Sequence, residues 1–273
     1  MTLHAIAPAP ETRSGLTTDL DLAMGQLGPQ GIAEQWLLRE CGDRHWAMLA
    51  AAMGQDRAEF ADAQGRPVYA AFCATSLKLT APPGPLLCAR ASLRSDIYGL
   101  GALQAGSVHE LRVPSGLVAR LEMISTFVSR DGSGSNRRIL RNGPVRSADL
   151  PPATPVLVDL AARARAVARA ARQETTHGPR LLEVTPSPAL DFNAVGLLYF
   201  PSFSRLAEEA EWAAGLAGAP LVDRDVVYLG NIDIGESLAL EAAEGGLTVR
   251  RGDGRAVARV RTRRAARVAC ALA

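Results

Sequence analysis

The sequence predicts an α+β fold in which two related units each wrap an antiparallel sheet around one long helix. Gly31 and Gly196 each open a long apolar segment with helical spacing that carries a tryptophan. Each segment is followed by a strand-like run that contains a tyrosine, Tyr69 in the first half and Tyr228 in the second. The same order of features therefore occurs twice, which indicates an internal repeat. With 48% hydrophobic residues in 273, the chain can form substantial cores.

The first unit is expected to span residues 19–147, after a flexible tail at 1–18 that contains Pro8, Pro10 and Gly15. The apolar segment Ala33 to Met53 predicts its central helix, and the run from Asp131 to Asn136 predicts a hairpin turn. Alternating and β-branched runs predict strands near Pro67–Leu79, Leu86–Leu100, Ser107–Val113, Gly116–Arg130 and Arg137–Arg141.

Residues 148–179 are expected to form a linker, because prolines cluster between Ala148 and Pro155 and the run Val156–Arg172 is rich in alanine and arginine. That run predicts a partly exposed helix. The second unit then spans 180–273, with a buried helix over Pro201–Leu216. Its strands are expected near Asp225–Leu229, Ser237–Glu244, Gly246–Arg251 and Ala256–Ala265.

The composition argues against several function classes. A net charge of +2 gives no support for nucleic-acid binding. No apolar run approaches the roughly 20 residues of a membrane span, and the first 18 residues do not resemble a signal peptide, so a cytoplasmic location without membrane association is expected. The four cysteines, Cys41, Cys73, Cys88 and Cys270, lack the close spacing of a zinc site or a disulfide framework. Nucleotide-binding loops, zinc-protease motifs and serine-hydrolase motifs are absent, so no metal is expected.

Arginines gather in three places, although the net charge is small. The clusters are Arg137, Arg138, Arg141 and Arg146; Arg163, Arg165, Arg169 and Arg172; and Arg250 through Arg267. Solvated faces explain such clusters without any function, and the alternation of arginine with apolar residues around Val257 and Val260 favours that explanation for the third. The alternative is that one cluster contacts the phosphates of coenzyme A or the acidic surface of a carrier protein.

The stretch from Asp191 to Phe203 is the most informative part of the chain. Gly196 has no Cβ, so a thioester can approach its backbone closely, and the N–H groups of the following helix start can face the carbonyl oxygen. The order of residues resembles the hotdog-fold superfamily, and most closely its 4-hydroxybenzoyl-CoA thioesterase branch. That resemblance implies that Asp191 is a catalytic carboxylate. Asn193 could orient a carbonyl or a water, and Gly196 is expected to contact the substrate through its backbone. The first unit has Gln26 in place of this aspartate.

Most of the chain, from about Leu20 onwards, also resembles the double-hotdog family of polyketide biosynthesis proteins. The resemblance rests on Gly31 to Trp46, Pro67 to Phe72, Ser125 to Arg130 and Gly230 to Leu238. Enzymes of the bifunctional acyltransferase/decarboxylase type in that family decarboxylate methylmalonyl-CoA and deliver the propionyl group to an acyl carrier protein, using an active-site tyrosine. The resemblance implies a double hotdog fold with two antiparallel sheets, and Tyr69 is the position to which that tyrosine role is transferred.

Each candidate residue also has an ordinary structural explanation. Tyr69 is a typical strand residue, and Asp191 and Asn193 suit a turn before a helix. Ser125 and Thr126 lie on a predicted central strand, where their hydroxyls could bind a carboxylate near an acyl pocket. Backbone N–H groups after Gly31 or Gly196 could stabilise an enolate oxygen. His45 is expected to be a core histidine with satisfied hydrogen bonds.

The main functional prediction is therefore an acyltransferase/decarboxylase that acts on a malonyl-type CoA thioester, together with an acyl carrier protein, in polyketide or related secondary metabolism. One alternative is an acyl-CoA or acyl-carrier-protein thioesterase that uses Asp191. Another is a protein that binds acyl groups without catalysis. Coenzyme A is expected only as part of the substrate, with no separate cofactor. Because a double hotdog already contains two central helices, the chain could be a monomer or a homodimer.

Overall fold

The computed structural model describes residues 15–81, 84–174 and 176–266. The expected tail as far as residue 14, and Cys270, lie outside these ranges. Residues 15–18 do not belong to a tail, because strand β1 (Gly15–Asp21) begins there and pairs antiparallel with β6 (Arg90–Gly101). β1 forms one edge of the sheet. The prolines and glycine of residues 1–18 had instead predicted a tail.

One large antiparallel sheet runs through the whole described part of the chain. Its strands follow the order β1-β6-β7-β8-β5-β11-β14-β13-β12-β10, with short β4 on β5 and short β9 on β8. A separate small hairpin is formed by β2 (Leu27–Gly28) and β3 (Gly31–Ile32). The remaining strands are β4 (Phe60–Ala61), β5 (Pro67–Leu79), β7 (Gln104–Val113), β8 (Gly116–Arg130), β9 (Ile139–Arg141), β10 (Arg180–Val184), β11 (Leu221–Tyr228), β12 (Leu238–Ala243), β13 (Gly246–Arg251) and β14 (Ala256–Arg264).

Two units make up this sheet, and they join edge to edge. The first contributes β1, β6, β7, β8 and β5, and the second contributes β11, β14, β13, β12 and β10. The seam is the antiparallel pairing of β5 with β11, from Lys78 opposite Asp223 to Ala74 opposite Val227. This confirms the predicted α+β double hotdog architecture, with a long helix in each unit.

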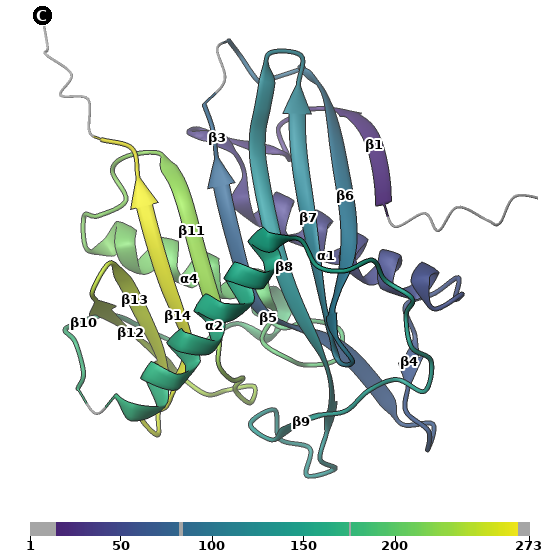
Figure 1. Cartoon of the computed structure of the whole chain (residues 1–273). Coiled ribbons are helices and arrows are strands. Elements are labelled where there is room, and N and C mark those ends of the chain that lie inside the picture. Colours follow the sequence, from purple (N-terminus) through teal and green to yellow (C-terminus); the bar gives the residue numbers. More distant parts are fainter. Residues whose placement is uncertain (1–14, 82–83, 175, 267–273) are drawn as a thin grey trace, which may run out of the picture.

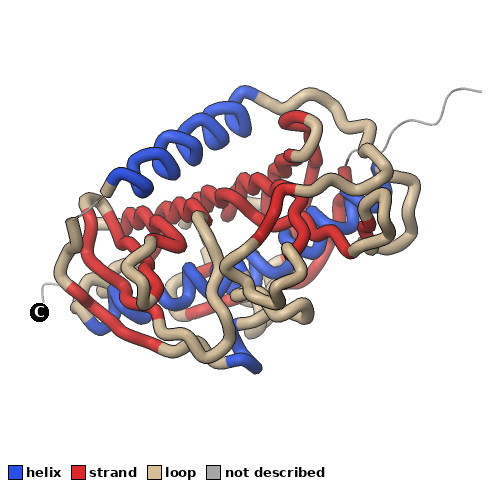
Figure 2. Tube along the Cα trace, turned by 90° about the horizontal axis from the view of Figure 1, so that it is seen from below, coloured by secondary structure: helices blue, strands red, loops and turns tan. Residues whose placement is uncertain are grey.

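The helices lie on both faces of the sheet (Figures 1 and 2). The central helices α1 (Glu34–Ala52) and α4 (Phe200–Ala213) cover one face, called here the inner face. The linker helix α2 (Pro155–Gln173) crosses the opposite, outer face near the seam. A single short helix, α3 (Pro188–Asp191), precedes the loop that leads into α4.

The layering explains why β8 is apolar on both sides. Met123 and Leu121 belong to the core beneath α1, whereas Ile124 packs with Leu160 and Ala161 of α2. A strand covered on both faces loses the usual apolar and polar alternation. The sequence predicted β5, β8 and β13 with the bounds that are observed. Helix α4 is shorter than expected, because Gly215 with φ +73° follows its end and leaves Leu216 exposed.

Candidate active site

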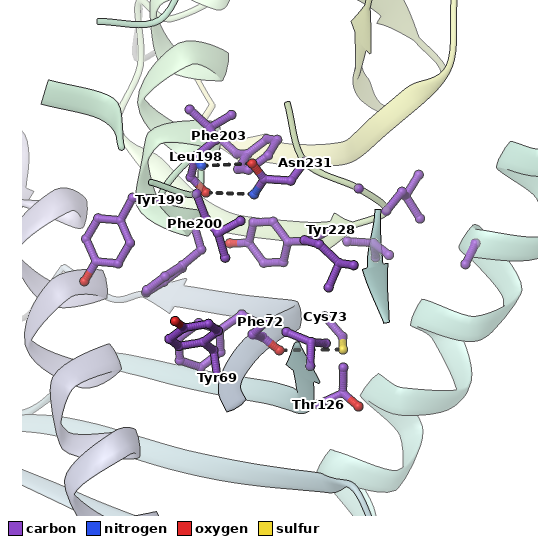
Figure 3. Close-up of a pocket in the computed structure, with 18 of the residues that line it drawn as sticks. Tyr69, Phe72, Cys73, Thr126, Leu198, Tyr199, Phe200, Phe203, Tyr228 and Asn231 are labelled. Atoms are coloured by element: carbon purple, nitrogen blue, oxygen red, sulfur yellow. Dashed lines mark hydrogen bonds between the residues drawn. The ribbon is translucent and has the colours of Figure 1, made fainter. Parts of the chain in front are cut away.

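A cavity of about 1490 Å³ lies where the two units meet. Its walls come from α1, β5 and β8 of the first unit, from the loop before α4 and the end of β11 in the second, and from α2 (Figure 3). The cavity exists because β5 continues past the end of β11. The seam pairing stops at Ala74 and Val227, so the edge of β5 from Tyr69 to Phe72 has no partner in β11.

The cavity is lined from both faces of the sheet. Phe72 packs on the inner face, where its ring lies 5.1 Å from that of His45 on α1. Tyr69 pairs with Val128, and Ala71 pairs with Thr126. Directly opposite residues of an antiparallel pair share a face, and this face is the one on which Ile124 meets α2. The opening beside β5 therefore connects the α1 side with the α2 side.

Aromatic rings form the inner wall. The ring of Phe200, the first residue of α4, lies 4.3 Å from the ring of Phe72 and 6.2 Å from that of Tyr228. Phe203 extends this wall, with its ring 5.4 Å from Tyr228. Such surfaces contact apolar groups with little desolvation cost, so the wall suits an acyl chain.

Asp43 is the carboxylate of the cavity wall that has no ion pair among the described residues. Glu174 and Asp253 also line the cavity, but Glu174 is bound by Arg250 and Arg259, and Asp253 is bound by Arg251. Asp43 stands on α1 at the cavity mouth. Partial burial and the neighbouring charge of Glu40 raise its pKa above the ordinary value.

Tyr199 lines the same mouth from the second unit. Burial, together with the charge of Asp43, raises the pKa of its hydroxyl to about 12, so Tyr199 stays protonated near neutral pH. No sequence pattern predicted a chemical role for Asp43 or Tyr199. Tyr199 lies within the stretch from Asp191 to Phe203, and Asp43 is one of several charged residues of α1, so neither local sequence identifies the other residue as its neighbour.

Tyr69 and Thr126 both line the cavity, as a substrate-contacting role requires. The Tyr69 hydroxyl makes no hydrogen bond within the described part of the chain, whereas the Thr126 hydroxyl donates to the Leu103 carbonyl at 3.2 Å. The expected match of Tyr69 with Tyr228 is wrong. Tyr228 points to the inner face, where its hydroxyl is hydrogen-bonded to Thr75 (3.1 Å), so the two tyrosines occupy opposite faces of the sheet.

Asp191 does not line the cavity, and it is 1% exposed. Its Oδ1 accepts hydrogen bonds from Arg205 Nε (3.0 Å) and Nη2 (2.7 Å), and its Oδ2 accepts one from the Ser187 N–H (2.9 Å). Its backbone carbonyl accepts from the Tyr199 N–H and the Ser202 hydroxyl. With both carboxylate oxygens occupied, the geometry does not fit the expected role as nucleophile or base. Asp191 instead holds the loop before α4.

The turn at Asn193 and Gly196 borders the cavity, but most of its N–H groups have internal acceptors. The Gly196 N–H donates to the Asn193 carbonyl, and the Val195 and Leu197 N–H groups donate to Asn193 Oδ1. Asn231 accepts from the Leu198 N–H and donates to its carbonyl (Figure 3). The expected oxyanion donors after Gly196 are therefore engaged, and Asn193 acts as a turn residue whose Oδ1 accepts two of these N–H groups.

The other two predicted contacts lie away from the cavity. Gly31 is in the β2–β3 hairpin, and Ser125 is buried on the inner face. Ser125 Oγ is hydrogen-bonded to His45 Nε2 (2.8 Å), and His45 Nδ1 is hydrogen-bonded to Ser107 Oγ (2.7 Å). Burial lowers the pKa of His45 to about 3, so it is a neutral core histidine, as expected. The Ser125 hydroxyl on the inner face of β8 thus forms a hydrogen bond within the core and does not face the cavity.

The hairpin loop 131–138 fixes the Asn193 turn from the first unit. Buried Asn136 donates from Nδ2 to the carbonyls of Gly196 (2.6 Å) and Ile232 (2.9 Å), and its N–H donates to Asp233. Arg130 contacts the Val195 carbonyl. The sequence predicted this hairpin, but its partners are 60 to 97 residues away, and no local pattern reveals them.

No helix in the described residues is long and apolar enough to cross a membrane. Within the same ranges, no group of three or more histidine, cysteine, aspartate or glutamate side chains is arranged to hold a metal ion.

Comparisons with known proteins address the fold. No family model and no curated protein sequence matches the chain. Among solved structures, it is similar to a 12:0-ACP thioesterase from Umbellularia californica, with a TM-score of 0.61 and 10% identity over 96% of this chain and 98% of that one. It is also similar to an acyl-ACP thioesterase from Bacteroides thetaiotaomicron, with a TM-score of 0.57 and 9% identity over 92% and 97%. The chain has the double hotdog fold. At these identities the likeness establishes the fold alone.

Proposed function

We propose that this protein is an enzyme that hydrolyses acyl thioesters, with Asp43 as the general base. The observation that carries the proposal is the carboxylate of Asp43, which has no ion pair in the described part of the chain and stands at the mouth of an aromatic-walled cavity. A raised pKa makes a carboxylate a stronger base than an aspartate with the ordinary pKa. The fold, which is similar over almost the whole chain to two acyl-ACP thioesterases, supports the same chemistry.

The reaction needs a base, an oxyanion donor and a site for the acyl chain. Asp43 would take a proton from water, and the resulting hydroxide would attack the thioester carbonyl. Tyr199, protonated at neutral pH, can donate to the oxyanion that forms. When the intermediate collapses, the carbon–sulfur bond breaks and the proton passes from Asp43 to the thiolate. Phe72 and Phe200 would contact the acyl chain.

The test compares Asp43→Asn with Asp56→Asn, an exposed aspartate just after α1. Thiol release from acyl-CoA substrates of several chain lengths is measured. We expect Asp43→Asn to lower kcat by about 10²- to 10⁴-fold, the range typical of a lost general base, and Asp56→Asn to leave it unchanged. Near-normal turnover by Asp43→Asn would overturn the assignment of the base.

A second candidate function is the acyltransferase/decarboxylase. The Tyr69 hydroxyl in the cavity wall supports it, because it has no hydrogen-bond partner among the described residues and could accept an acyl group or donate to an enolate oxygen. Decarboxylation of methylmalonyl-CoA would release carbon dioxide and leave a propionyl group for transfer to an acyl carrier protein. Incubation with methylmalonyl-CoA separates the possibilities. Propionyl transfer supports this second candidate, free acid supports hydrolysis, and binding without turnover indicates a non-catalytic acyl-binding protein.

A further inference from the structure

On the outer face of the sheet the cavity opens beside α2, and this part of the cavity is called here the α2 opening. The side of α2 that faces it carries only small and basic side chains. Small side chains on α2 line the cavity at Ala161, Ala164, Ala168 and Ala171. Arg165 and Arg172 line it too, two helical turns apart on the same side of the helix. Arg163 and Arg169 belong to the same helix but do not line the cavity. Both cavity-facing arginines are exposed, and neither has a carboxylate partner among the described residues.

Two more arginines line the cavity from other elements. Arg141 ends β9, and Arg255 belongs to the turn between β13 and β14. That turn lies near the C-terminal end of α2 (Figure 1). Their guanidinium groups also have no carboxylate partner in the described ranges. The acidic residues nearby do not offset this charge, because Glu174 is held by Arg250 and Arg259, and Asp253 by Arg251.

Several other arginines of the first and third clusters are paired with carboxylates. In the third cluster, Arg259, Arg263 and Arg264 are each paired with a carboxylate. Arg137 of the first cluster is paired with Glu236. Arginines already paired contribute little net attraction to an incoming anion. Among the described residues, the cavity-lining arginines without a carboxylate partner are therefore Arg141, Arg165, Arg172 and Arg255, together with Arg39, which stands on α1 near Tyr199. Only α2 contributes two of them, and the aromatic wall lies on the other side of the sheet.

This combination fits an elongated ligand with an anionic end and an apolar end. Arginine forms strong charge-assisted hydrogen bonds with phosphate, and the alanines leave room for a slender chain beneath α2. We propose that the α2 opening binds the phosphate of a phosphopantetheine arm, with Arg165 and Arg172 as its ligands from the helix. The arm then passes through the gap beside β5, so that the thioester reaches Asp43 and Tyr199. The proposal rests on the proposed thioester function and deepens it.

The experiment uses two thioesters that differ only in the phosphate, hexanoyl-phosphopantetheine and hexanoyl-pantetheine. The test variant is Arg165→Gln with Arg172→Gln. The matched control is Arg163→Gln with Arg169→Gln, which removes the same charge from the same helix away from the cavity. Arginine and glutamine have similar helix propensities, so both variants should fold. Thermal unfolding verifies that they do.

We expect the wild type to prefer the phosphorylated thioester in kcat/KM, and this preference to weaken as salt rises. The test variant should reduce the preference by about three- to tenfold, the range for partly exposed charge pairs, and change turnover of hexanoyl-pantetheine little. The control should keep the wild-type preference. Equal preference in the test variant and the wild type, or equal loss in the test and control variants, would overturn the proposal.

Binding of the free arm separates this inference from the proposed function. Calorimetry with phosphopantetheine and with pantetheine needs no turnover, so it tests the α2 opening even if no thioester is hydrolysed. A phosphate-dependent affinity that only the test variant loses supports the site, whereas equal affinity for the two compounds overturns it. Coenzyme A and a holo carrier protein are then compared as sources of the arm. Weaker binding of both by the test variant is expected, because they share the phosphate.

Discussion

Asp43 owes its proposed role to its neighbours. It lies on the side of α1 that faces the second unit's Tyr199, beside Glu40 of its own helix. Glu40 is bound by Arg44, yet its charge still raises the pKa of Asp43. Because the base must be ionised, activity should be present above the raised pKa and should fall as the pH drops through it.

This dependence gives a prediction about Glu40. Glu40→Gln removes a like charge, so the pKa of Asp43 should fall and the acid limb of the kcat/KM profile should move to lower pH. Turnover on the pH plateau should stay within a few-fold of the wild type. The profile is measured by thiol release across the acidic range. An acid limb that stays in place would show that Asp43 does not control it.

The two tyrosines give a second prediction at this scale. Tyr69→Phe removes a hydroxyl without a hydrogen bond, so the free energy of unfolding should not change, whereas propionyl transfer from methylmalonyl-CoA should be lost if Tyr69 carries that reaction. Tyr228→Phe breaks the bond to Thr75 and should cost about 1 kcal/mol of stability while activity persists. Denaturant unfolding and transfer assays measure both. Normal transfer by Tyr69→Phe would leave hydrolysis as the better description.

Among the elements, the contact between α1 and the start of α4 shapes the inner wall. A Cβ added to Gly42 would lie 2.9 Å from Phe200 Cε1 and 3.0 Å from its Cζ. Gly42 therefore lets the Phe200 ring pack directly against α1. Since the same ring also packs on Phe72, this close approach sets the width of the cavity between the two units.

Gly42→Ala tests this contact by the sign of its effect. In an exposed helix interior, replacing glycine by alanine stabilises by about 0.5–1 kcal/mol. Here the added methyl group should displace Phe200 and lower the free energy of unfolding by about 1–3 kcal/mol. The KM for long-chain thioesters should rise as well. Gly54→Ala serves as a comparison. A Cβ added to Gly54 would contact no atom within 4 Å, but the φ of +68° would strain the backbone of an alanine there. A stabilised Gly42→Ala protein would contradict the proposed packing.

At the scale of the whole molecule, a buried charge cluster links the two units behind the cavity. The Arg224 side chain of β11 is 0% exposed. It donates to Glu34 of α1 (2.6 Å) and to Glu208 (2.7 Å) and Glu211 (3.1 Å) of α4. Arg264 contacts the same two α4 carboxylates. Burial raises the pKa of Glu34, so its ionised form depends on Arg224.

Removing Arg224 should destabilise the association of the units. Arg224→Met leaves buried carboxylates without a full complement of positive charge, which should lower the free energy of unfolding by about 3–5 kcal/mol. The deficit should shrink as the pH falls, because carboxylates with raised pKa values favour the folded state once protonated. Arg263→Met, which removes an exposed partner of Asp223, should cost less than about 1 kcal/mol. Equal losses in the two variants would contradict this account.

The sequence determined the repeated architecture and several element bounds by itself. Hydrophobic periodicity depends on neighbouring residues, so it revealed the central helices and the long strands β5 and β8 without tertiary information. The same local signals placed Asn193 and Gly196 in a turn before a helix, at what proved to be the cavity edge. The part of the site that a contiguous motif encodes was therefore predictable.

Only the tertiary structure decided which polar groups can act. From the sequence, the side chains of Asp191 and Ser125 were expected to contact the substrate. In the folded protein Arg205 donates hydrogen bonds to Asp191, and Ser125 is hydrogen-bonded to His45. Asp43 became a candidate base because the β5–β11 seam brings α1 against the loop before α4, which contains Tyr199, 199 − 43 = 156 positions further along the chain. A side chain's burial and pairing depend on such distant contacts, which local patterns do not encode. The chemistry of this site is thus a property of the seam between the two units.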